Sequence, residues 1–190
     1  MRKSRKEAAE TRARIVDAAS VEFRRNGIGA TGLSELMAAA GLTHGGFYRH
    51  FGSKDELVAE TCASAAEGLI ASIATARAEE PDRRGLETIL GDYLSSDRRD
   101  DPSGICPFAA LGGEIARSSD PVRDAATDGF RKLVDVIAAE FGKTGPDIAR
   151  GRALAALCTM VGALTMSRMV NDPDLSDEIL REVKASLARA

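Results

Sequence analysis

Several kinds of residue on which enzymes, metal sites and secreted proteins depend are scarce in this sequence. Trp is absent, Phe and Tyr together make up 4% of the 190 residues, and there are two His and three Cys. Cys62, Cys106 and Cys158 are widely spaced, form no CxxC pair and follow no secretory signal, so we expect a reduced, cytoplasmic protein. The His and Cys spacing also lacks the paired pattern of structural zinc, and we expect no metal and no cofactor.

Long apolar runs and a strong excess of one charge are missing too. No run approaches the roughly 18 apolar residues that would span a bilayer, so we expect no membrane partner. The net charge is −3, with ten Lys or Arg against eight Asp or Glu in residues 1–60, and sixteen against twenty-one in residues 61–190. A mildly basic front end permits a local DNA-binding patch, but charge alone does not indicate one.

Ala and Leu are abundant instead, and apolar residues recur at helical spacing without an alternating strand pattern. This predicts an all-α fold of about nine helices with close helix packing. Residues 1–52 are expected to form a three-helix head and residues 53–190 a helical C-terminal domain. A helix of five turns or more, starting at Ser53, would belong to both parts. Residues 97–104 (DRRDDPSG) are the most polar stretch and predict an exposed loop.

Residues 30–58 carry the strongest signal for function. Thr31 is a plausible N-cap for a two-turn helix, and Gly41 can close that helix in a left-handed conformation. Thr43 then offers the N-cap of a second helix. The stretch therefore predicts a helix, a tight turn and another helix.

The second helix of this motif, expected over residues 44–51, is short and contains Gly45 and Gly46. Each glycine costs about 1 kcal/mol relative to alanine inside a helix. Either the glycines serve a tight corner, or the missing side chains let the backbone approach a large partner closely. Phe47 and Phe51 lie four residues apart and should pack inward.

Ser53 and Glu56 form a Ser-x-x-Glu capping box that should start the third helix. Its free amides and Lys54 would suit a phosphate. Two helix N-termini, several hydrogen-bond donors and the Tyr48 hydroxyl lie within about a dozen residues. This grouping is more typical of a surface that reads a DNA groove than of a catalytic site.

One run of residues gives a specific resemblance: Gly41-Leu42-Thr43-x-x-x-Phe47-Tyr48-x-His50-Phe51-x-Ser53-Lys54-Asp55-x-Leu57. It is similar to the DNA-binding signature of the TetR (tetracycline repressor) family of transcriptional regulators. Together with the helix before it, the resemblance covers about residues 10–60, roughly a third of the chain.

The resemblance implies a homodimeric, ligand-responsive regulator of double-stranded operator DNA, with a helix-turn-helix head and a C-terminal domain for effector binding and dimerisation. We expect a repressor that a small-molecule effector releases from a palindromic operator. Residues 44–50 would enter the major groove, with Lys54 and the start of the first motif helix on phosphates. The residues expected at the DNA are Thr31, Ser34, Thr43, His44, Gly45, Gly46, Tyr48, Arg49, His50 and Lys54.

The resemblance also implies that the last two helices form the dimer interface. The helix that begins at Pro146 carries a short apolar seam flanked by small residues, which permit close helix approach. Burial of this seam within one chain is the alternative. The residues expected at the interface are Leu154, Leu157, Val161, Ile179 and Val183.

Effector-binding residues are expected among the C-terminal helices, although core packing is the more usual role of each candidate. The candidates are Cys106, Phe108, Leu111, Phe130, Met160 and Leu164. Cys106 follows the polar stretch and lies near a helix N-terminus, where the helix dipole can lower its pKa. This gives an alternative function, a repressor that senses electrophiles or oxidants through Cys106. A small buried thiol is the opposing interpretation.

Two other classes of protein fit less well. An enzyme using Cys106 would need a histidine base, but His44 and His50 both lie in the turn motif, so no catalytic residue is assigned. A helical adaptor that binds other proteins without DNA would explain the apolar C-terminal faces. It leaves Gly45, Tyr48 and the capping box without a role.

Overall fold

The computed structural model describes residues 5–79, 85–101, 106–142 and 145–189. Within these ranges the chain contains nine α-helices, one short 3₁₀ helix (η1) and no strand, which confirms the predicted all-α class. In chain order the helices are α1 (Arg5–Asn26), α2 (Leu33–Ala39), η1 (His44–Arg49), α3 (Lys54–Glu79), α4 (Gly85–Tyr93), α5 (Ser96–Asp100), α6 (Pro107–Ile115), α7 (Asp120–Ala139), α8 (Pro146–Met169) and α9 (Pro173–Ala188).

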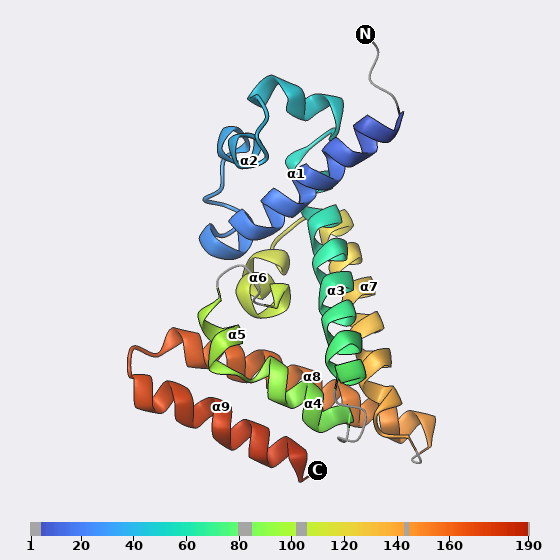
Figure 1. Cartoon of the computed structure of the whole chain (residues 1–190), viewed down its shortest axis with the longest axis vertical. Coiled ribbons are helices and arrows are strands. Elements are labelled where there is room, and N and C mark those ends of the chain that lie inside the picture. The colour runs from blue at the N-terminus through green and yellow to red at the C-terminus, as the bar shows by residue number, and fades with distance from the viewer. Residues whose placement is uncertain (1–4, 80–84, 102–105, 143–144, 190) are drawn as a thin grey trace.

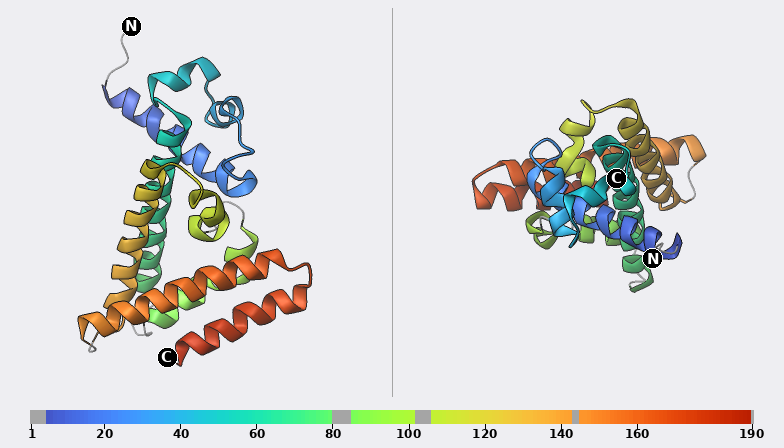
Figure 2. Two further views of the ribbon diagram at one scale, coloured as in Figure 1. Left: turned by 180° about the vertical axis from the view of Figure 1, so that it is seen from behind. Right: turned by 90° about the horizontal axis from the view of Figure 1, so that it is seen from above.

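The helices form a head and a body that are joined by a long rod (Figure 1). The head, made of α1, α2 and η1, lies at the N-terminal end, and α4, α8 and α9 lie together at the opposite end with the C-terminus. Between them α3 and α7 run side by side, as the view from behind also shows (Figure 2). α6 lies between the head and α8, and contacts both.

One apolar face of α1 packs on the two helices of the turn motif and builds the core of the head. Phe47 and Phe51 stack with their ring centroids 5.6 Å apart, which confirms that both point inward. The buried side chains of this core are Ile15, Val16, Ala19, Phe23, Leu36, Met37, Phe47 and Phe51.

The end of α2 has the geometry that the sequence predicts. Gly41 has a φ of +68°, a left-handed conformation that favours glycine. The backbone N–H of Gly41 donates to the Ala38 carbonyl, and that of Leu42 donates to the Met37 carbonyl at 2.8 Å. This pair of bonds is a Schellman motif, which satisfies carbonyls that the helix end would otherwise leave open.

The start of α2 differs from the prediction, because its N-cap is Gly32 and not Thr31. The Thr31 side chain is 1% exposed, and its hydroxyl donates to the Gly27 carbonyl at 2.6 Å. The hydroxyl therefore closes the loop that leads into α2. A threonine hydroxyl just before a helix can cap that helix or bond to a carbonyl of the preceding loop. Here the burial of Thr31 favours the loop.

The core of the head continues along the rod and into α6. Seven further members of the same buried cluster come from α3, α6 and α7: Leu57, Val58, Cys62, Leu111, Ile115, Val122 and Ala126. Glu114 of α6 adds a polar contact, since its carboxylate accepts a hydrogen bond from the backbone N–H of Gly29 at 2.8 Å. The border expected between residues 52 and 53 thus crosses one continuous core, and a movement of the head has to shear this packing.

Part of the stretch predicted as an exposed loop is helical. Residues 96–100 form α5, and the Ser95 side chain caps it by accepting a hydrogen bond from the backbone N–H of Arg98 at 3.1 Å. Asp101 is the exposed C-cap of α5, and residues 102–104, the rest of that prediction, lie outside the described residues. A polar stretch can form a loop or a short exposed helix, and Ser followed by Asp also starts helices.

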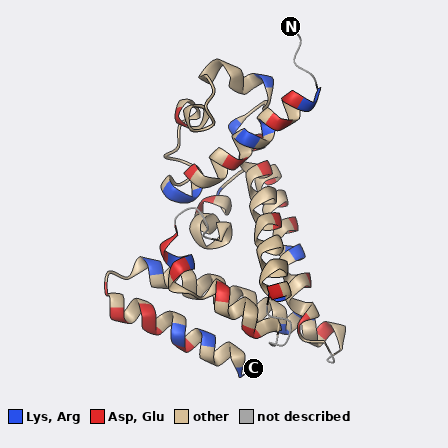
Figure 3. Ribbon diagram, viewed as in Figure 1, with Lys and Arg blue, Asp and Glu red and all other residues tan. Residues whose placement is uncertain are grey.

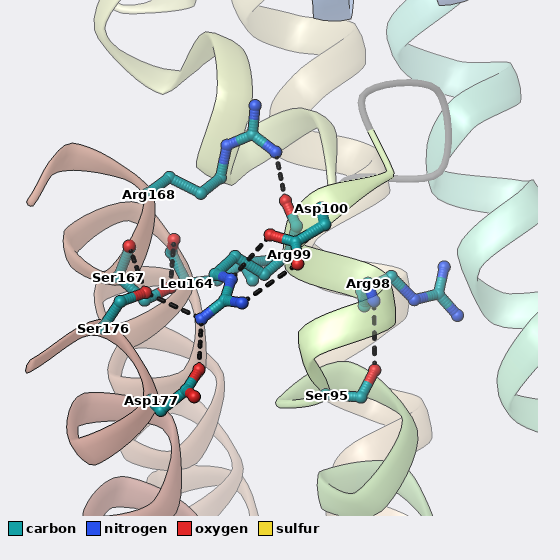
Figure 4. A network of polar contacts seen from close by, with 9 residues as sticks. All are labelled: Ser95, Arg98, Arg99, Asp100, Leu164, Ser167, Arg168, Ser176 and Asp177. Carbon is teal, nitrogen blue, oxygen red and sulfur yellow. Dashed lines mark hydrogen bonds and ion pairs between the residues drawn. The ribbon is translucent and has the colours of Figure 1, made fainter. Parts of the chain in front are cut away.

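Figure 4 shows how α5 is fixed to the end of the body. Arg99 of α5 donates to the hydroxyl of Ser176 at 2.8 Å and to the carboxylate of Asp177 at 2.6 Å, both on α9. Arg168 of α8 donates to the main-chain carbonyl of Arg99. The hydrogen bonds that the Arg99 guanidinium donates to the carboxylates of Asp100 and Asp177 raise its pKa. Two charged side chains therefore connect α5, α8 and α9.

Two helices are apolar enough to match a membrane span by length and composition, which the search for continuous apolar runs overlooked. Windows of 18 residues in α3 and α8 have mean hydropathies of 1.4 and 1.2. In this fold 44% and 39% of these windows are buried inside the chain. Most of their buried apolar side chains belong to the core of the head or to a second core in the body, which includes Leu69 and Ile73 of α3 and Ala153, Leu157, Met160 and Leu164 of α8.

The rod of α3 and α7 depends on one close approach of the two helices. At Gly129 of α7, an added Cβ atom would lie 2.7 Å from the Cβ atom of Ala66 on α3. Atoms of two short, stiff side chains cannot occupy that distance, so glycine is needed here for packing.

Replacing Gly129 with alanine should lower the free energy of unfolding by about 1–3 kcal/mol, because the rod has to open to admit the methyl group. Urea unfolding followed by circular dichroism measures the change. Gly68→Ala on the exposed side of α3 is the matched control, since an added Cβ there meets nothing within 4 Å. It should raise stability by about 0.5–1 kcal/mol. Equal stabilities of the two variants would show that the helices are further apart than described.

Candidate DNA-binding site

The outward side of η1 presents the residues that the sequence analysis assigned to the major groove. Tyr48 is 66% exposed, and His44, Gly45 and Arg49 are exposed beside it. Phe47, 0% exposed, holds the Tyr48 ring edge-on with 5.2 Å between the ring centroids. The buried phenylalanines thus fix the inner face of η1 and leave its outer face exposed.

Neither glycine of η1 is required by packing within the chain. An added Cβ atom at Gly45 would meet nothing within 4 Å, and one at Gly46 would make an ordinary 3.5 Å contact with Met37. Neither glycine has a positive φ. A tight corner therefore does not explain them, and the alternative, a close approach of the backbone to a partner, is favoured.

Hydroxyl groups stand at the N-termini of both motif helices. Ser34 in the first turn of α2 is exposed. Thr43, also exposed, is the N-cap of η1 as predicted, although its side chain makes no capping hydrogen bond. Both are free to donate to a phosphate, whereas the Thr31 hydroxyl is used inside the head.

The capping box at the start of α3 is present. The Ser53 hydroxyl accepts a hydrogen bond from the backbone N–H of Glu56 at 3.1 Å. The Glu56 carboxylate accepts in return from the N–H of Gly52 at 2.7 Å, one residue before the usual partner. A hydrogen bond from Arg12, and then the one from Gly52, lower the pKa of Glu56.

Lys54 has contacts that the sequence did not indicate. Its ammonium donates to the Ile28 carbonyl at 2.5 Å and to the Thr31 carbonyl at 2.7 Å, both in the loop between α1 and α2. An ammonium has three donors, so one is left for a phosphate. Lys54 is therefore first a support of that loop.

Two arginines of α1 also support the motif, although the sequence analysis assigned no role to either. Arg12 donates to the carbonyl of His50 and to the carboxylates of Glu56 and Glu60. Arg14 donates to the carbonyl of Ala40 at 2.6 Å. Their spacing gives no signal, because Lys/Arg and Asp/Glu alternate along α1 as on many solvated helices (Figure 3).

The six candidate effector residues are not brought together into one site. Cys106, Met160 and Leu164 are buried in the core of the body, while Leu111 belongs to the core of the head. Phe108 and Phe130 are partly buried and meet edge-to-face, with their ring centroids 5.6 Å apart. Phe108 packs against both cores and so lies at their junction.

Cys106 does not have the environment of a reactive thiol. The side chain is 2% exposed, and burial raises the pKa of the thiol. Hydrogen bonds with Tyr93 and with the backbone N–H groups of Ala109 and Phe108 act in the opposite direction, as a helix N-terminus should, but burial outweighs them. The expectation of a lowered pKa was therefore wrong. Burial also raises the pKa of Cys62, to about 11.

The expected interface residues are divided between the core and the surface. Leu157 is 1% exposed and packs inside its own chain, and Val161, Ile179 and Val183 are partly buried against the same core. Leu154 is 36% exposed. Among the described residues, the other exposed large apolar side chains apart from Tyr48 also lie on α8 and α9: Ile148, Met166, Met169 and Leu175. A hydropathy pattern alone could not separate these from core residues.

No group of three or more His, Cys, Asp or Glu side chains that could hold a metal ion occurs in the described parts of the chain.

Two models of known protein families match the chain. The family described as "Bacterial regulatory proteins, tetR family" matches residues 15–61, which include most of the head. The description "Transcriptional regulator LmrA/YxaF-like, C-terminal domain" belongs to the model that matches residues 83–185.

Individual proteins show the same division. The HTH-type transcriptional regulator TtgR of Pseudomonas putida is 43% identical over 58 residues, which span 30% of this chain and only 28% of TtgR. The HTH-type transcriptional regulator LmrA of Bacillus subtilis (strain 168) is 25% identical over 158 residues, 82% of each chain.

Solved structures share the fold at low sequence identity. A TetR transcriptional regulator from Chloroflexus aurantiacus J-10-FL aligns with a TM-score of 0.78 at 24% identity, over 97% of this chain and 95% of its own. The reduced form of E. coli NemR aligns with a TM-score of 0.77 at 18% identity, over 94% and 95%. Since one family model covers the head and the other covers more than half of the sequence, the chain belongs to the TetR family of bacterial regulatory proteins.

Proposed function

We propose that the chain is a homodimeric, cytoplasmic repressor without enzymatic activity, which binds a palindromic operator and leaves it when a small molecule binds the body. The observation that supports DNA binding best is the outer face of η1, where Gly45 is exposed and its missing side chain has no role inside the chain. A glycine that weakens a short helix without a benefit to the fold, and that lies beside the exposed Tyr48, supports a partner at that face.

In this proposal η1 enters the major groove with His44, Tyr48, Arg49 and His50, while the glycines bring the backbone close to the DNA. Ser34 and Thr43, at the two helix N-termini, and the remaining donor of Lys54 would contact phosphates. Thr31 acts indirectly through the loop. With few long side chains at the groove, sequence would be read largely through DNA shape and close backbone contact.

A selection from random duplex DNA with the purified protein, followed by fluorescence-anisotropy titrations, tests this proposal. We expect enrichment of a palindromic sequence that binds in the range of about 10⁻⁸–10⁻¹¹ M, at least 10³-fold tighter than random duplex. Binding that does not distinguish sequences, or no binding at all, would favour the adaptor interpretation.

Gly45→Ala should weaken binding to the selected duplex about 10-fold or more, because the added methyl group holds the backbone away from the groove. The same change should raise the stability of the protein by up to about 1 kcal/mol, since no atom of the chain is in its way. Gly68→Ala on α3 is the control, expected to stabilise equally and to leave DNA binding unchanged. Tight binding by Gly45→Ala would remove close backbone approach from the proposal.

Dimerisation through α8 and α9 is supported by an outward face without a partner in the chain. Met166 is 43% exposed, and Gly162 lies four residues before it on the same side of α8, where an added Cβ atom would meet nothing within 4 Å. An exposed apolar side chain next to a helix glycine that the fold does not need suits a second helix packed closely.

Gly162→Arg should convert the dimer into a monomer, because it places a charge where the partner helix would pack. Size-exclusion chromatography with light scattering should show the mass fall from twice 20.1 kDa to 20.1 kDa. Binding to the palindrome should fall together with the mass, since one head reads only half of the site. Gly68→Arg, at an exposed helix glycine of α3 and not of α8, should remain dimeric, and an unchanged mass for Gly162→Arg would move the interface elsewhere.

The effector would act through α6. Phe108, in the first turn of this helix, packs against both cores, and Glu114, near its end, accepts a hydrogen bond from the Gly29 amide of the head. A ligand that moves α6 within the body would therefore shift the loop before α2. In a dimer such a shift changes the spacing of the two recognition helices and disfavours the operator-bound state.

The alternative of electrophile sensing through Cys106 has little support from the structure, and N-ethylmaleimide tests it. Because Cys106 is buried and its thiol pKa is raised, the DNA complex at neutral pH should survive the reagent with Cys106 unmodified. Mass spectrometry of proteolytic peptides should find Cys106 alkylated only after unfolding. Rapid alkylation with release of DNA, abolished by Cys106→Ser, would reinstate this function.

A further inference from the structure

Both helices of the turn motif end at a carbonyl group that receives a hydrogen bond from an arginine of α1. Ala40 is the C-cap of α2, and its carbonyl accepts from Arg14 at 2.6 Å. His50 is the C-cap of η1, and its carbonyl accepts from Arg12. Two arginines separated by a single residue therefore hold the two ends of the motif from one helix.

These contacts occur where the motif is weakest. α2 has seven residues and η1 has six, far fewer than a helix needs to be stable alone in water. η1 is a 3₁₀ helix, whose hydrogen bonds are poorly aligned, and contains two glycines. The C-terminal carbonyls of a helix lack partners within it, and a cation there also interacts favourably with the helix dipole.

Arg12 already has several partners within its own chain. Its Nε donates to Glu60 at 2.9 Å and its Nη2 to Glu56 at 2.8 Å, both on α3, and its guanidinium lies 4.0 Å from the centre of the Phe51 ring. The side chain is 31% exposed, and two carboxylates face its single positive charge. It therefore fixes η1 to α1 and α3, and it is a poor phosphate ligand.

We propose that Arg12 and Arg14 are positioning residues for DNA recognition: they set the direction of η1 relative to α2 without contacting DNA. This inference rests on the proposed function. Contacts to base edges and close backbone contacts depend on the angle of η1 in the groove, so only these contacts benefit from a fixed geometry. The phosphate contacts that drive sequence-independent binding tolerate a small rotation. Loss of either arginine should thus reduce specificity more than overall attraction to DNA.

Arg12→Gln, Arg12→Lys and Arg14→Gln are compared with wild type on the selected palindrome and on random duplex, over several salt concentrations. Arg12→Gln should lose about 10- to 100-fold in affinity for the palindrome and less than about 3-fold for random duplex. Its salt slope should equal that of wild type, because no phosphate contact is lost. Arg12→Lys should recover part of the loss, since one ammonium can reach the His50 carbonyl but not all three partners.

Arg25→Gln is the control, because Arg25 also lies on α1 but at its far end, 3.9 Å from Glu22. It should behave as wild type. If Arg12→Gln weakens both duplexes equally and lowers the salt slope by about one unit, Arg12 is a phosphate contact and the inference is wrong. Unchanged affinity for the palindrome would also overturn it.

Amide hydrogen exchange without DNA keeps the inference separate from the proposed function. Arg12→Gln should speed exchange at the amides of residues 46–51 at least about 10-fold, while the middle of α1 stays protected. Unchanged exchange in η1 overturns the inference whether or not the protein binds DNA. If Arg12→Gln fails to fold, Arg14→Gln, which removes one contact at the end of α2, decides by the same measurements. A wild type that enriches no sequence contradicts the proposed function alone.

Discussion

The orientation of η1 depends on the burial of Phe47 and Phe51, because the hydrogen bonds of a six-residue 3₁₀ helix are too few and too poorly aligned to hold it in place. Both rings enter a core that also contains Leu111 of α6 and Val122 of α7. Contacts from α6 and α7, as well as from the head, therefore decide the orientation of η1. This arrangement has a functional consequence, since any ligand that repacks α6 or α7 changes the surroundings of the two phenylalanines. A rigid, separate head could not respond in that way.

Charge is used in the head mainly to hold the backbone. Arg12 donates to the main-chain carbonyl at the end of η1, and Arg14 to the one at the end of α2. Lys54 donates to two carbonyls in the loop before α2. A count of cations would have assigned all three to phosphates. Because these charges are spent internally, the net charge of −3 and the lack of a basic excess are compatible with sequence-specific binding. In the proposed function, specificity then comes from geometry, and general attraction to DNA remains modest.

Features that local rules determine were predictable from the sequence, and features that depend on tertiary contacts were not. The left-handed Gly41, the inward phenylalanines and the Ser53 cap follow from neighbouring residues and were confirmed. Arg12 reaches partners 38 to 48 residues away, so no spacing could announce it. Burial is equally non-local. It placed Leu157 in the core, one of the two alternatives that the apolar seam left open, and it raised the pKa of Cys106 although the helix N-terminus favours the thiolate.

Glycines within the helices show how a partner surface can be recognised in a single chain. Gly129 is explained by its neighbours, because an added methyl group would collide with Ala66. Gly45 and Gly162 have open space instead, but so does Gly68, and an unexplained glycine alone is therefore insufficient. The distinction lies in what surrounds them. Gly45 lies next to the exposed Tyr48 and Gly162 next to the exposed Met166, whereas no large exposed apolar side chain accompanies Gly68 among the described residues. Open space beside exposed apolar surface favours one partner at η1 and another at α8, as a dimer on DNA requires.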